Sequence, residues 1–171
     1  MRKIRITERN GVKMSIERVR EYFRNYGMEE RIIELAESSA TVELAAAALH
    51  CEPQRIAKTL SFALPERTIL IVAAGDAKID NAKYKARFKT KAKMLAPQEA
   101  ELLTGHAVGG VCPFAVKEGV KVYLDVSLKR FETVFPACGS SNSAIELTVD
   151  ELEKYSGCEE WVDVCKETES R

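Results

Sequence analysis

The segments RIAKTLSFAL, residues 55–64, and RTILIVAAG, residues 67–75, decide how this chain folds. Both are rich in apolar and β-branched residues, and Pro65-Glu66 between them is a turn signal. We therefore expect two neighbouring strands at the centre of the domain, with the rest of the chain arranged around them.

Lys58 is the unusual residue of the first strand. Side chains alternate between the two faces of a strand, so one face carries Ile56, Lys58, Leu60 and Phe62. A lysine among large apolar residues is unfavourable unless its ammonium group reaches water or an anion. Two interpretations stay open. The side chain either extends to solvent at the strand end, or lines a cleft and binds a negatively charged or carbonyl-bearing ligand.

Short helices and strands alternate along the rest of the chain. The pattern predicts helices at residues 14–27, 38–51, 80–88, 96–105 and 148–157, the last opened by the capping box Thr148–Glu151. It predicts further strands at residues 120–127, 130–137, 143–148 and 160–165, whereas residues 28–37 fit either a short helix or a strand. This order indicates an α+β fold, a curved mixed sheet with flanking helices.

One domain is expected, because 171 residues suffice for a single core. Met14 opens the first clear helix, so the domain is predicted to span residues 14–171, with residues 1–13 as an N-terminal extension. The chain has no apolar run long enough to span a bilayer and no secretory signal. Its five cysteines include no Cys-x-x-Cys pair, which indicates reduced thiols and a cytoplasmic location.

The charges balance overall but cluster locally. Twenty-six basic residues offset twenty-six acidic ones, which argues against a surface that binds nucleic acid everywhere. Between residues 78 and 93, however, seven basic residues face a single acidic one, and they are Lys78, Lys83, Lys85, Arg87, Lys89, Lys91 and Lys93. This segment is either a solvated helix face or a site for a polyanion such as an RNA backbone.

The segment GHAVGGVCPF, residues 105–114, holds three glycines. Such a stretch is either a plain turn or a place where another group approaches the backbone closely. His106, Cys112 and Cys138 could meet in space, either as packed buried thiols or as a thiol or metal enzyme's site. No recognised metal spacing occurs, and we predict neither a metal nor a cofactor.

Several of these segments, taken in order, resemble a known family. RIAKTLSF, AAGDAKID, TGHAVGGVCPF and VYLDVSL, followed by a glycine before an IEL strand, are similar to the YbaK/ProX family of aminoacyl-tRNA deacylases. The resemblance runs from about Ser38 to the C-terminal helix. It implies a barrel-like sheet and hydrolysis of the ester between a wrongly attached amino acid and its tRNA. It also implies a free-standing trans-editing protein with tRNA-Pro as substrate and prolyl-tRNA synthetase as a possible partner.

The family's motifs fall on particular residues of this chain. Its invariant lysine falls on Lys58, followed by Thr59, and its Gly-Gly pair falls on Gly109 and Gly110. Its later pocket glycine falls on Gly139. The chain departs from the family pattern at Cys112, at residues 140–142 and at residues 37–41. These departures leave the amino acid specificity open.

We therefore expect three catalytic residues. Backbone N–H groups at Gly109 and Gly110 would stabilise the oxyanion, and Lys58 would hold the terminal adenosine phosphate or the substrate carbonyl. Substrate-binding residues are expected at Thr59, Gly139, Ser140, Ser39 and Thr41, and the acceptor arm is expected at Lys83, Lys85 and Lys89. The alternative is a non-catalytic module that binds tRNA or an aminoacyl-like small molecule. The sequence does not determine the oligomeric state.

Overall fold

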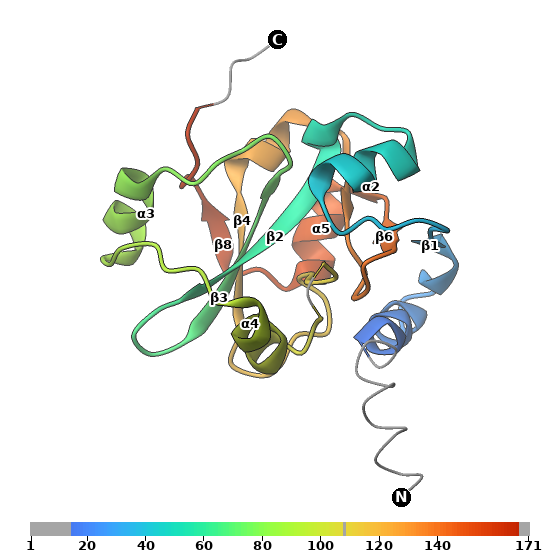
Figure 1. The fold of residues 1–171 in the computed structure, drawn as a ribbon, viewed down its shortest axis with the longest axis horizontal. Helices are drawn as coiled ribbons and strands as arrows, with labels where there is room; N and C mark the ends of the chain where they lie inside the picture. Colours follow the sequence, from blue (N-terminus) through green and yellow to red (C-terminus); the bar gives the residue numbers. More distant parts are fainter. Residues whose placement is uncertain (1–14, 108, 168–171) are drawn as a thin grey trace, which may run out of the picture.

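A computed structural model describes residues 15–107 and 109–167 (Figure 1). The predicted N-terminal extension, residues 1–13, lies outside the described residues. The two expected central strands are present as β2, Ile56–Ala63, and β3, Thr68–Ala74. They pair antiparallel from Ala57 opposite Ala74 to Ala63 opposite Thr68. All residues of β3 after Thr68 are buried, so both faces of the sheet are covered here.

A curled, mixed, six-stranded sheet grows outward from this pair in the order β7-β5-β2-β3-β4-β8 (Figure 1). The added strands are β4, Lys121–Asp125; β5, Thr133–Pro136; β7, Leu147–Thr148; and β8, Glu160–Val162. The contacts β2–β5, β3–β4 and β4–β8 are parallel, whereas β5–β7 is antiparallel. The predicted α+β fold with a curved mixed sheet is confirmed.

A second, two-stranded sheet shows that the predicted strand 143–148 is divided in two, and it contains part of the ambiguous stretch 28–37. The predicted strand 143–148 is two strands, since β6, Ser143–Ile145, pairs with β1, Ile32–Glu34, while β7 joins the large sheet. A strand pattern cannot reveal that successive residues pair with different partners. The ambiguous stretch 28–37 contains a 3₁₀ turn, Glu29–Arg31, followed by β1.

The helices begin where the sequence supplies caps. Thr41 and Asp80 accept backbone hydrogen bonds at the starts of α2, Val42–Leu49, and α3, Asn81–Phe88. Proline occupies the first turn of α4, Pro97–Thr104. The N-terminal helix covers residues 15–24, and short 3₁₀ turns lie at Pro53–Arg55 and Val126–Arg130. None of the helices in the described part of the chain is long and apolar enough to cross a membrane.

The two faces of the sheet pack against different helices. On one face, side chains of the N-terminal helix and α5, Val149–Ser156, join a core that contains Val19, Phe23, Leu70, Val72, Leu124 and Leu152. On the other face, α3 packs through Tyr84 against Phe62, while α2 packs through Ala45 against Ile56. Lys58 lies between Ile56 and Phe62 on the same face of β2.

The capping box at the start of α5 gives a stability prediction. Thr148 Oγ1 accepts from Glu151 N–H at 3.1 Å, and the Glu151 carboxylate accepts from Thr148 N–H at 2.9 Å. Thr148→Ala removes one of these bonds and should lower the free energy of unfolding by about 1 kcal/mol in urea titration. Thr148→Ser keeps the hydroxyl and should retain most of the stability. Equal stability of both variants and wild type would contradict the role of the cap.

Candidate functional site

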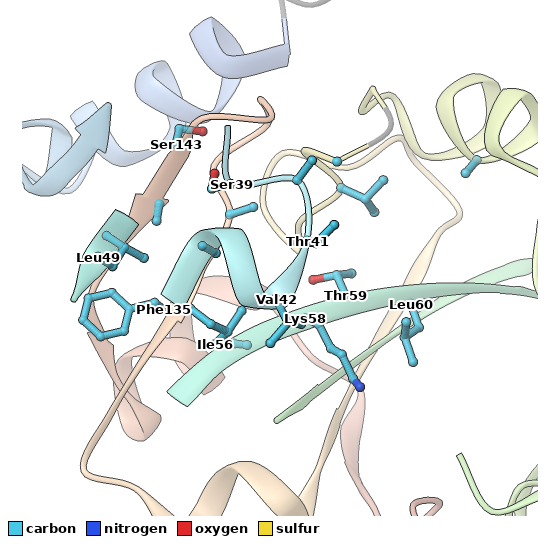
Figure 2. Close-up of a pocket in the computed structure, with 18 of the residues that line it drawn as sticks. Ser39, Thr41, Val42, Leu49, Ile56, Lys58, Thr59, Leu60, Phe135 and Ser143 are labelled. Atoms are coloured by element: carbon cyan, nitrogen blue, oxygen red, sulfur yellow. The ribbon is translucent and has the colours of Figure 1, made fainter. Parts of the chain in front are cut away.

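A cavity of about 340 Å³ opens beside β2 (Figure 2). Its walls come from α2, the loop before α2, the start of α4, the glycine segment and the ends of β5 and β6. Most of the lining is small or apolar, and it includes Ala45, Leu49, Ala57, Val111, Phe135, Ala137 and Ala144. Hydroxyl groups and one lysine are the polar side chains of the wall. This composition suits a small, partly apolar group with a few polar atoms.

Lys58 lies at the wall with its ammonium group held by backbone carbonyls. Its Nζ donates to Gly75 O at 3.3 Å and, in a shorter bond, to Ala77 O. Desolvation on burial lowers the pKa of Lys58 from its ordinary value. The loop that holds it packs tightly, since a Cβ on Gly75 would lie 2.0 Å from Pro53 O. The side chain therefore does not extend freely to solvent, and the tight loop presents its ammonium group at a fixed position.

Thr59 faces the opposite side of the strand. Figure 2 shows its side chain leaving β2 away from that of Lys58. Thr59 lines the cavity, and its Oγ1 is buried with no hydrogen-bond partner among the described residues. A buried hydroxyl without a partner is unfavourable, so this oxygen is available to a ligand.

Ser39 and Thr41, two of the residues predicted to bind substrate, also line the cavity, and both already serve the local fold. Ser39 Oγ donates to Ser141 O at 3.2 Å, and Thr41 Oγ1 caps α2 by accepting from Leu44 N–H at 3.1 Å. Each hydroxyl keeps spare hydrogen-bonding capacity. Ser39 and Thr41 are part of the cavity wall, and their backbone positions are fixed there.

The paired glycines take different places. Gly109 lines the cavity with a φ of 82°, and a Cβ there would lie 3.0 Å from the Ala40 Cβ. The Gly110 N–H donates to Ala107 O at 2.9 Å, and a Cβ there would lie 2.5 Å from Ser140 N. The Gly110 N–H thus closes a turn, and the lack of a side chain allows two loops to touch. Of the two, Gly109 is the one at the cavity surface.

Gly139 and Ser140 lie behind the cavity wall. A Cβ on Gly139 would lie 2.8 Å from Ser15 O, so this glycine lets the N-terminal helix approach. Ser140 is buried and donates to Ser143 Oγ at 2.7 Å. Ser143 itself lines the cavity, although its position at a strand start gave no functional signal in the sequence.

His106 and Ser15 form a buried pair outside the cavity. Ser15 Oγ lies 2.5 Å from His106 Nδ1, and His106 Nε2 lies 2.7 Å from Phe114 O. Cys112 Sγ is 3.6 Å from the same Nε2, and burial raises the pKa of Cys112 to about 12. Cys138 is also fully buried. These groups tie the N-terminal helix to the glycine segment, and substrate cannot reach a pair enclosed in this way.

No group of three His, Cys, Asp or Glu side chains is placed to hold a metal within residues 15–107 and 109–167. Cys112 and His106 meet, but the arrangement there is that of packed core side chains.

The basic segment is partly neutralised by β8 and the residues after it. Lys83 Nζ pairs with Asp163 at 3.1 Å, and Arg87 pairs with Glu160. Lys85 on α3 and Lys89, the residue directly after α3, are exposed. The positive potential available to an anion is therefore centred on Lys85, Lys89 and the lysines that follow them.

Comparison with known proteins identifies the class. The aminoacyl-tRNA editing domain family matches residues 36–155, a range that contains all the cavity-lining residues. The chain therefore belongs to this family, and the resemblance drawn from the motifs is confirmed.

Two individual proteins and one solved structure are also similar to this chain. The chain is 55% identical over 157 residues to the Bacillus subtilis (strain 168) protein YwhH, named as uncharacterized, covering 91% of this chain and 100% of that protein. It is 29% identical over 102 residues to a proline–tRNA ligase of Geobacillus sp. (strain WCH70), covering 59% of this chain but 18% of the ligase. A crystal structure described as a candidate trans-editing enzyme for prolyl-tRNA synthetase superposes with a TM-score of 0.80 at 27% identity, covering 90% of this chain and 98% of that one.

The buried His106 gives a pH prediction. Desolvation lowers the pKa of His106 from 6.5 to about 4, so between these values the unfolded chain binds more protons than the folded one. The free energy of unfolding should therefore fall as pH drops from about 6.5 toward about 4, by at most about 3 kcal/mol from this group.

Urea unfolding of wild type and His106→Asn at pH 7.5 and pH 5 measures this contribution. The variant should be less stable at pH 7.5 and should lose less stability on acidification. His50→Asn, at an exposed histidine, is the matched control and should keep the wild-type pH difference. An unchanged pH difference in His106→Asn would show that His106 does not titrate in this way.

Proposed function

We propose that this protein is a free-standing trans-editing aminoacyl-tRNA deacylase that hydrolyses the ester of a mischarged tRNA, with tRNA-Pro as its tRNA. The observation that carries the proposal is the cavity, which combines a small apolar space with the fixed ammonium group of Lys58 inside the matched family segment. The similarity to a proline–tRNA ligase and to a candidate prolyl trans-editing enzyme supports the choice of tRNA.

The reaction requires water rather than a protein nucleophile. Water adds to the ester carbonyl carbon, the bond from this carbon to the ribose oxygen breaks, and that oxygen takes up a proton. The products are a free amino acid and a tRNA with free terminal hydroxyls. The Ser15–His106 pair is the arrangement that could suggest a nucleophile and its base, but it is buried away from the cavity.

Lys58 supplies the electrostatic contribution in this mechanism. A cation held by Gly75 O and Ala77 O needs no reorganisation when negative charge approaches it. Its side chain leaves β2 on the side opposite that of Thr59 (Figure 2). We place the terminal adenosine phosphate at Lys58 and the aminoacyl group on the Thr59 side of the cavity, near Gly109.

Lys58→Ala should reduce hydrolysis by about 100-fold or more, a typical effect of removing one preorganised electrostatic contact. The measurement is release of amino acid from a panel of tRNA-Pro samples that carry alanine, cysteine or serine. Lys117→Ala is the matched control, because Lys117 Nζ also holds a backbone carbonyl, Leu102 O at 2.6 Å, but lies outside the cavity. Thermal unfolding of both variants monitors the fold.

Two results would contradict the proposal. Wild-type turnover that survives Lys58→Ala would remove Lys58 from the mechanism. Binding of these tRNAs without release of any amino acid would instead support the non-catalytic module.

The exposed lysines in and directly after α3, Lys85 and Lys89, are proposed to contact the acceptor arm. Neutralising Lys85 and Lys89 together to Ala should weaken tRNA binding and reduce the slope of log K against log salt by about 1 to 2. Filter binding at several salt concentrations gives this slope. A double variant at Lys121 and Lys154 carries the same charge change and should keep the wild-type slope. Equal slopes in the two double variants would place the RNA elsewhere.

A further inference from the structure

The outer edge of β2 has a gap at Thr59, where the ladder of hydrogen bonds is interrupted. On one side of the gap, β5 pairs with β2 only at Ile56 and Ala57. On the other side, Leu95 N–H donates to Ser61 O at 3.1 Å, and Ala63 N–H donates to Lys93 O at 2.8 Å. No other described segment pairs with β2 between these two ladders.

Prolines terminate the pairing on both sides. Pro136 is the last residue of β5 and lies opposite Ala57, and the chain after it bridges to Ala144 instead. On the other side, the pairing of Met94 opposite Phe62, continued in register, would bring residue 97 opposite Thr59. That residue is Pro97, which has no N–H to donate and begins α4.

The backbone of Thr59 therefore faces the gap. Alternate residues of a strand direct their N–H and C=O groups to the same edge. Since Ser61 and Ala63 bond to the segment 93–95, the N–H and C=O of Thr59 point to that edge as well. The β5 pairing ends at Ala57 and the bonds to the segment 93–95 begin at Ser61, so the N–H and C=O of Thr59 have no ladder partner at this edge among the described residues. Thr59 Oγ1 also lacks a partner there.

The cavity occupies this gap. Its wall includes Ala57 and Thr59 of β2, Ala137 just after β5, and Leu95 and Pro97 from the other flank. The N–H, C=O and hydroxyl of a single residue thus meet a cavity whose remaining wall is largely apolar. A ligand that replaces the missing strand residue would satisfy these groups together.

We propose that Thr59 binds the aminoacyl group of the substrate as one residue of an antiparallel strand, an inference that rests on the proposed function. Two residues of an antiparallel pair exchange two N–H···O bonds. An aminoacyl ester carries one donor, its α-ammonium group, and one acceptor, its carbonyl, on the same residue. The α-ammonium group donates to Thr59 O, and the ester carbonyl accepts from Thr59 N–H.

This placement assigns a role to each side of the strand. Side chains opposite each other in an antiparallel pair lie on the same face, so the amino acid side chain lies on the Thr59 face. Lys58 points to the other face (Figure 2). The N–H of Thr59 then polarises the carbonyl that water attacks. It is a hydrogen-bond donor in addition to those expected from the glycine segment. Thr59 Oγ1 accepts a second bond from the ammonium group.

The test compares two non-hydrolysable probes, 3′-deoxy-3′-(L-alanylamino)adenosine and its propionylamino counterpart, which differ only in the α-ammonium group. The alanyl probe should bind wild type at least about tenfold more tightly, the usual effect of a hydrogen bond to a charged group. Amide hydrogen exchange followed by NMR should show slower exchange of the Thr59 N–H with saturating alanyl probe. The Leu60 N–H, which faces β3 opposite Ile71, is the internal control and should be protected in both states.

Two variants separate the hydroxyl from the backbone. Thr59→Ser keeps the hydroxyl and should preserve alanyl-probe affinity within about threefold, whereas Thr59→Val should weaken it by about fivefold or more. An unchanged Thr59 exchange rate with bound probe, or equal affinity for the two probes, would overturn the inference. Deacylation of alanyl-tRNA is measured separately, so hydrolysis without Thr59 protection would refute this binding mode and leave the proposed function standing.

Discussion

The structure depends on the antiparallel ladder between β2 and β3. Its register places Ala57 opposite Ala74 at one end and Ala63 opposite Thr68 at the other, and β3 is buried after Thr68. Every other strand of the large sheet joins one side of this pair. The helices pack on its two faces, α5 on one and α2 and α3 on the other. Hydrophobic burial on both faces explains why this ladder is regular while the strands outside it are short.

The two edges of the β2–β3 pair are paired differently, and this difference creates the site. β3 is followed by β4 and β8 in an unbroken parallel series. β2 instead meets β5 at one end and the segment 93–95 at the other, with unpaired backbone at Thr59 between them. An unpaired strand edge in a protein interior is unfavourable unless something satisfies it. Here the cavity lies at the unpaired edge, so the sheet itself provides polar groups for a ligand.

Much of the fold could be predicted from the sequence, because local signals decide it. Alternation predicted the central hairpin, and Asp80, Pro97 and Thr148 marked helix starts. Within the site, the position of Lys58 on an apolar face and the family resemblance indicated the residues around β2. The sequence did not indicate Ser143 or Leu95 as cavity residues, because each reaches the cavity through pairing with distant parts of the chain. It also treated the two glycines alike, although Gly109 lines the cavity and Gly110 supports a loop contact.

The sequence by itself determined the class of fold, the hairpin at the centre of the sheet and the family, since these follow from periodicity, caps and the order of motifs. Tertiary structure alone decided which polar groups are free to act. The N–H of Gly110 is taken by Ala107, and Ser15 and His106 satisfy each other in the core. The backbone of Thr59 stays free because the two segments that flank it end their pairing at prolines. Hydrogen-bond satisfaction depends on which distant segments meet, and no local pattern in the chain records that.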